Sequence, residues 1–238
     1  MAMDKLSVLF VGFGMLGDFF RPYGYQRTIL GSAASLVLRG HDAAILELMW
    51  KEAKPFTTHI ELLVEGSKVK VRLIRAVFRR HEKVASRHGL FFYVDSVRTR
   101  LSREFEELLL GSGLDYVICG GRIPWFLSRH IARVAGAKLL LRPPKVELMD
   151  LPGWAHEGLS ASAWMYAMFL YTIPLAHMSD WVLSVAPPDE RLLRRFLVRR
   201  HLRIPLRGRG RGAGKGVGRG EEALLRGLQA ELAPCEAC

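Results

Sequence analysis

The chain has 238 residues, half of them apolar and about a quarter charged, a balance typical of a soluble globular protein with one sizeable core. Three cysteines are too few for a disulfide framework, and glycines interrupt the apolar run near the N-terminus, which excludes a secretory signal pattern. We therefore expect a reducing, cytoplasmic setting. The terminal Cys235-x-x-Cys238 pair has no second pair to complete a zinc site, so we expect no metal.

The basic charge of the chain is concentrated near its C-terminus. Residues 199–220 contain eight Lys and Arg residues and no acidic residue, and leaving them out lowers the net charge from +12 to +4. Residues 207–220 are Arg/Gly-rich and cannot bury a core. We therefore predict a domain over residues 1–205 and a disordered low-complexity tail over residues 206–238.

Short apolar runs and segments of helical spacing alternate along the predicted domain. The runs that predict buried strands are 6–12, 43–48, 115–119, 138–141 and 181–185. The segments that predict helices are 26–39, 101–110, 125–135 and 187–196, and residues 59–74 predict a hairpin around Gly66. This order predicts an α/β, Rossmann-like fold, with a mainly parallel sheet covered by helices on both faces.

A glycine-rich motif follows the first predicted strand. Gly12, Gly14 and Gly17 match G-x-G-x-x-G, the fingerprint of dinucleotide binding. However, Pro22 interrupts the helix that should follow, and Glu47, the candidate ribose-binding acid, comes about thirty residues after Gly17 and not the usual ~20. Three interpretations stay open: NAD(P) binding, a glycine loop without a ligand, or a longer loop for another phosphate-bearing ligand.

Several segments between residues 5 and 198 carry a recognisable order of motifs. They are Pro22-Tyr-Gly24-Tyr25, Leu38-Arg39-Gly40-His41-Asp42, Asp115-Tyr-Val-Ile118, Ala135-Gly-Ala-Lys138 with Arg142, and Ser179-Asp180-Trp-Val182. In this order they resemble the N-terminal domain of group 1 (family 4) glycosyltransferases of the GT-B fold. The resemblance implies the acceptor-side domain of a nucleotide-sugar-dependent hexosyltransferase, whose partners are a nucleotide sugar and a sugar or lipid acceptor.

The resemblance also implies where the ligands bind. The loop that faces the donor phosphates comprises Gly12, Gly14, Gly17, Arg21 and Gly24. The cleft for acceptor and donor comprises Gly120, Gly121, Arg122 and Arg142. No catalytic residue is identified, and the nucleotide sugar is a substrate, so no separate cofactor is expected. In this family the donor site lies on a second, C-terminal domain, so we expect the chain alone to be weakly active or inactive. The change of composition at Leu206 suggests a truncated or frameshifted reading frame, which the genomic sequence beyond that codon would test.

Two other functions remain as alternatives. The first is an NAD(P)-binding Rossmann oxidoreductase, based on the glycine motif. The second is a basic adaptor at a membrane or a nucleic acid. Residues 160–176 are uncharged and rich in aromatic side chains, which suits a core helix or a peripheral contact with the inner membrane face. The Arg/Gly tail has no interleaved aromatic residues, so nucleic acid is not the partner we expect.

Overall fold

The computed structural model describes residues 5–13, 24–50, 56–64, 66–78, 109, 111, 113–121, 124–143, 170, 172–184, 187–195 and 201–203. The chain divides into two compact units at the bond between Arg142 and Pro143, and each unit is described by itself. This boundary falls inside the predicted domain, while the predicted tail lies outside the described residues. The predicted limits at residues 205 and 206 therefore stay a prediction.

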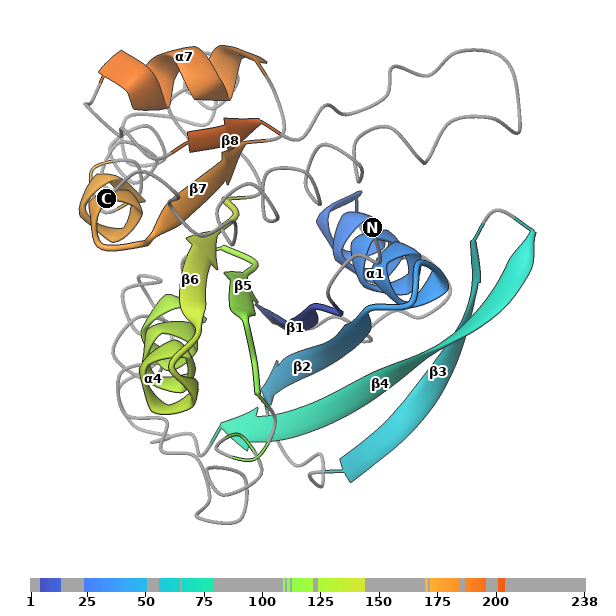
Figure 1. Cartoon of the computed structure of the whole chain (residues 1–238). Helices are drawn as coiled ribbons and strands as arrows, with labels where there is room; N and C mark the ends of the chain where they lie inside the picture. Colours follow the sequence, from blue (N-terminus) through green and yellow to red (C-terminus); the bar gives the residue numbers. More distant parts are fainter. Residues whose placement is uncertain are drawn as a thin grey trace, which may run out of the picture. The chain divides into compact units, whose positions relative to one another are not determined.

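The first unit is built on a mainly parallel sheet (Figure 1). Its strands are β1 (Ser7–Phe13), β2 (Asp42–Trp50), β3 (Phe56–Val64), β4 (Ser67–Phe78), β5 (Tyr116–Cys119) and β6 (Lys138–Leu141). They lie in the order β3-β4-β2-β1-β5-β6, and every neighbouring pair is parallel except the antiparallel β3 and β4. The predicted hairpin is present, with Gly66 at a φ of 79° in its turn. The Rossmann-like α/β fold predicted from the sequence is thus confirmed.

Helices α1 (Gly24–Leu38) and α4 (Trp125–Ala135) cover opposite faces of this sheet (Figure 1). The connection β1–α1–β2 runs toward β4, whereas β5–α4–β6 runs in the opposite direction along the sheet. Because parallel crossovers are almost always right-handed, connections that run in opposite directions place their helices on opposite faces. The strands between them are therefore covered on both sides, which explains why β5 is buried at every position.

The turn between α1 and β2 joins three elements through Arg39-Gly40-His41. Gly40 has a φ of 86°, and the His41 N–H donates to the Leu36 carbonyl at 3.0 Å, as in a Schellman-type helix end. The buried His41 side chain accepts a hydrogen bond at Nδ1 from the Leu6 N–H (3.3 Å), just before β1. The turn that carries part of the family resemblance therefore positions the first strand.

In the second unit, β7 (Trp181–Ser184) and β8 (His201–Arg203) pair in parallel, and α7 (Pro187–Arg195) connects them along the chain. The sequence predicted β7 and α7 but not β8, because a three-residue strand with a single apolar residue has no measurable alternation. Residues 172–177 are helical. The predicted helix 101–110 lies outside the described residues, apart from Leu109. No helix among the described residues is long and apolar enough to cross a membrane.

We predict that protonation of His41 destabilises the fold. Burial, and next the charge of Arg39, lower the His41 pKa below its ordinary value of 6.5. A protonated Nδ1 also cannot accept the Leu6 hydrogen bond. Below about pH 6.5 the unfolded chain therefore binds a proton that folded His41 resists, so the free energy of unfolding falls as the pH falls.

Urea unfolding at about pH 7.5 and about pH 5.5 measures this effect. The wild-type protein should lose more stability over that interval than His41→Gln, which keeps an acceptor but does not titrate. The other histidines are present in both proteins and cancel in the comparison. Equal losses would show that His41 is not the group responsible.

Candidate functional site

The candidate site is the carboxyl edge of the sheet between β1 and β5. The chain runs outward from β1 to β2 and β4, then returns to the other side of β1 as β5. Such a reversal of strand order leaves a crevice at the carboxyl ends, because the helices that follow the two strands depart on opposite faces. In doubly wound sheets, ligands ordinarily bind in this crevice.

The structure brings the two glycine-containing strand ends together at this point. Val11 of β1 lies opposite Cys119 of β5, and the Gly120 N–H donates to the Val11 carbonyl at 2.8 Å. Gly12 follows Val11 directly, so Gly12 and Gly120 occupy neighbouring strands at the same height. One boundary prediction was wrong. The strand does not end at Gly12 but continues to Phe13, because Gly12 is still paired in register with Glu47 of β2.

Gly120 and Gly121 form a tight turn held by the chain itself. The Gly121 N–H donates to the Cys119 carbonyl at 3.0 Å, and the Cys119 thiol donates to the Gly121 carbonyl at 2.9 Å. Gly121 has a φ of 105°, a conformation that side chains other than glycine rarely adopt. The turn is therefore preorganised, and it presents backbone to the crevice without a Cβ.

Arg142 reaches the same edge from β6. Its N–H donates to the Cys119 carbonyl at 2.8 Å, one residue beyond the pairing of Cys119 with Leu141. Only 4% of the residue is exposed. A buried guanidinium is a fixed positive charge in surroundings of low polarity, where it acts more strongly on an anion than a surface cation does.

Four of the predicted site residues lie outside the described part of the chain. They are Gly14, Gly17 and Arg21 of the donor loop and Arg122 of the acceptor and donor cleft. Gly24 is the first residue of α1, so it lies at the N-terminus of a helix that follows β1. The helix predicted from residue 26 therefore starts slightly earlier. The structure thus brings together Gly12, Gly120, Gly121 and Arg142, and it leaves the rest of the predicted donor loop as a prediction.

Sequence reasoning missed a buried ion pair beside Gly12. Glu47 is fully buried, and its Oε2 accepts a hydrogen bond from Nε of Arg75 at 2.8 Å and forms an ion pair with Nη2 at 2.8 Å. The two residues are direct neighbours on β2 and β4. Glu47 was the candidate ribose-binding acid of the dinucleotide interpretation. In the structure its carboxylate is instead paired with Arg75 of the neighbouring strand. A carboxylate with no exposed surface and a guanidinium partner is poorly placed to reach a ribose hydroxyl.

Five residues form one row at the carboxyl ends of β1, β5 and β6, a height at which β2 and β4 continue for three more residues. In order along the sheet they are Arg75, Glu47, Gly12, Gly120 and Arg142. Side chains at the same height in a parallel register share a face. The Cys119 side chain, one position earlier, interacts with Ser128 of α4. The strand positions of the row therefore face the opposite side of the sheet, where α1 lies, and Arg75 at its outer end is paired with Glu47.

No nucleophile is evident in this row. Burial raises the pKa of the Cys119 thiol to about 12, so it stays protonated at neutral pH and is a poor nucleophile. Within the described ranges, no group of three His, Cys, Asp or Glu side chains is placed to hold a metal ion. Because the charges of Arg75 and Glu47 neutralise each other, the row offers two glycines beside the buried, positively charged Arg142, which suits recognition of an anion.

The comparisons with known proteins come from structure alone. Neither the protein-family models nor the curated proteins yield a match to this sequence. A solved structure of sucrose-phosphate synthase from Thermosynechococcus elongatus is similar with a TM-score of 0.54 and 12% identity, over 84% of this chain and 48% of that one. A second, shorter structure of that enzyme gives a TM-score of 0.50 and 15% identity, over 95% of this chain and 98% of that one.

These similarities define the fold. The chain shares the Rossmann-like α/β architecture of these sucrose-phosphate synthase structures. It spans about half the length of the first sucrose-phosphate synthase structure. At such low identity the likeness concerns architecture, so the function has to be argued from the site itself.

The turn at Gly121 gives a test of this geometry with a matched glycine control. Gly121→Ala should destabilise the protein by about 1–3 kcal/mol, because it forces a Cβ into a positive-φ conformation. Gly31→Ala lies inside α1, where an added methyl meets nothing within 4 Å, and should stabilise by about 0.5–1 kcal/mol. Urea denaturation measures both. A Gly121→Ala protein as stable as wild type would contradict the turn described here.

Proposed function

We propose that the chain is the acceptor-side domain of a nucleotide-sugar-dependent glycosyltransferase. The observation that supports this most directly is the row at the β1–β5 edge, where Gly12 and Gly120 present backbone without a side chain and Arg142 supplies buried positive charge. The GT-B-type fold and the motif order of the sequence point to the same class of ligand. A donor diphosphate carries the negative charge that such an edge favours.

The proposal assigns a binding role to this domain and leaves the main donor contacts to a second domain. In the family that the sequence resembles, donor phosphates are held largely by a further nucleotide-binding-like domain. This chain covers about half of sucrose-phosphate synthase, which is consistent with one domain of such a pair. Transfer of a glycosyl group depends on positioning and on stabilising the leaving diphosphate. We therefore expect the chain alone to bind its ligands weakly and to turn over slowly or not at all.

The alternative is an NAD(P)-dependent oxidoreductase. The same β1–β5 crevice binds dinucleotides in many proteins of this architecture. The state of Glu47 favours the transferase, because this carboxylate is fully buried and paired with Arg75, whereas a ribose-binding acid would be open to the ligand. The two functions predict different ligands for the same edge, so a binding experiment separates them.

The test is calorimetric titration of the full chain with UDP-glucose, ADP-glucose, NAD and NADP. We expect at least one nucleotide sugar to bind more tightly than either dinucleotide. Arg142→Gln should weaken that binding about tenfold or more, because a charge-assisted contact in a buried setting is lost. Arg133→Gln, an exposed arginine on α4, is the matched control and should leave the affinity unchanged.

Two outcomes would overturn the proposal. Tighter binding of NAD or NADP than of every nucleotide sugar would favour the oxidoreductase. Equal losses of affinity in the Arg142 and Arg133 variants would show that general surface charge, and not the row at the carboxyl edge, attracts the nucleotide. Circular dichroism of each variant confirms that it is folded before its affinity is compared.

A further inference from the structure

A second concave site lies at the opposite edge of the same sheet. It is a cavity of about 720 Å³ within the first unit, near the amino ends of β1 and β2. We call it the amino-edge cavity and define it by Leu9, Ala44, Arg72, His59, Leu109 and Leu114, which are among its lining residues. Its volume is in the range of small-molecule sites. It shares no residue with the row at the carboxyl edge.

The floor of the amino-edge cavity is one cross-strand row. Leu9 of β1 is paired with Ala44 of β2, Ala44 with Arg72 of β4, and Arg72 with His59 of β3. Residues paired in this way present their side chains on the same face. The floor therefore changes from apolar at β1 to polar and cationic at β4 and β3.

The apolar end of the cavity has a wall as well as a floor. Leu109, which is 4% exposed, and the half-buried Leu114 line it together with Leu9. An apolar group placed there would be removed from water on several sides at once. The binding free energy gained in this way is proportional to the apolar area covered.

The cationic end of the cavity is formed by Arg72 and His59. Two other cations on these strands and just before β1 already have acidic partners, since Lys5 pairs with Asp42 at 2.8 Å and Lys70 with Glu61 at 3.7 Å. Arg72 is exposed, and among the described residues no ion pair reaches it. The neighbouring His59 is exposed and offers a ring N–H. An oxyanion at this point could accept from both side chains.

We propose that the amino-edge cavity binds a single-chain amphipathic anion. Its apolar chain lies against Leu9, Leu109 and Leu114, and its phosphate or carboxylate group contacts Arg72 and His59. This site is separate from the proposed glycosyl-transfer edge and does not depend on that function. Covalent chemistry plays no part in the proposal, which concerns binding alone.

The experiment is calorimetric titration of the full chain with octyl phosphate, below its micelle concentration. Inorganic phosphate and octanol test the two halves of the ligand, and octanoate distinguishes a carboxylate head from a phosphate. We expect octyl phosphate or octanoate to bind about tenfold or more tightly than either half alone. If neither amphiphile binds, or if a half-ligand binds equally well, the proposal is wrong.

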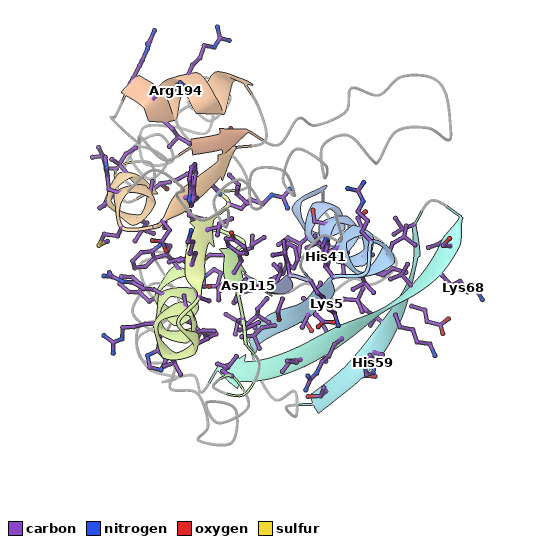
Figure 2. All side chains as sticks on the ribbon, viewed as in Figure 1. Lys5, His41, His59, Lys68, Asp115 and Arg194 are labelled. Carbon is purple, nitrogen blue, oxygen red and sulfur yellow. The ribbon has the colours of Figure 1, made fainter. Side chains whose placement is uncertain are left out.

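Matched variants locate the site. Arg72→Gln should weaken binding about tenfold, because the charged contact is lost. Lys68→Gln is the control, since Lys68 lies on the same strand and face, is exposed, and stands well away from His59 near the turn of the hairpin (Figure 2). Ala44→Phe should abolish binding by filling the floor, whatever the head group.

The same variants exclude the obvious competing explanation. The Arg72 and Lys68 variants could lose the same affinity for octyl phosphate, and the protein could bind vesicles of anionic lipid with similar affinity. In that case the exposed basic side chains of the β3–β4 hairpin attract the anion, and the cavity is not a binding site. Unchanged affinity in a folded Ala44→Phe protein would overturn the proposal in the same way.

Discussion

The pairing of β1 with β5 is the constraint on which the candidate site depends. It places two strands that are distant in the sequence side by side, and the bond from the Gly120 N–H to the Val11 carbonyl continues that pairing just past the end of β5. Because both strands run in the same direction, their glycines meet at one edge. The helices that follow then leave on opposite faces, which opens the crevice. A shift of one residue in this register would turn Gly12 away from the row and replace it with a bulky neighbour.

The two edges of the sheet differ in chemistry for reasons that can be traced to single strands. On β2, Ala43 and Ile45 continue to Glu47, and on β4, Val71 and Leu73 continue to Arg75. Each strand therefore carries a charge on its buried face, three residues before the strand ends, and the two charges lie at the same height and neutralise each other. Removing either partner would leave the other buried and uncompensated, which typically costs about 3–5 kcal/mol. The pair stabilises the contact between β2 and β4 beside the carboxyl edge. Gly12 and Gly120, next to it, present backbone without a side chain.

Much of the fold was predictable because β1, β5 and β6 are buried on both faces and read as short apolar runs. Residues 125–135 and 138–141 match α4 and β6, since Gly136 ends the helix with a φ of 68° and Pro143 follows the strand closely. The site was only partly predictable. Glycines after strands mark the carboxyl edge, but the partner of Glu47 depends on the register between β2 and β4, which one strand's sequence does not contain. β8 has too few residues to show the alternation of apolar and polar residues that predicts a strand. The amino-edge cavity is lined by four strands and a loop that are separate in the sequence, so no single segment predicts it.

The central claim is that a phosphate-bearing nucleotide binds at the β1–β5 carboxyl edge, and amide hydrogen exchange with and without UDP-glucose tests it most directly. The account predicts slower exchange at Gly120 and Gly121 and at the end of β1 when the nucleotide sugar is present, with the amino ends of the same strands unchanged. Binding that leaves these amides unaffected, or that slows exchange only at the opposite edge of the sheet, would contradict it.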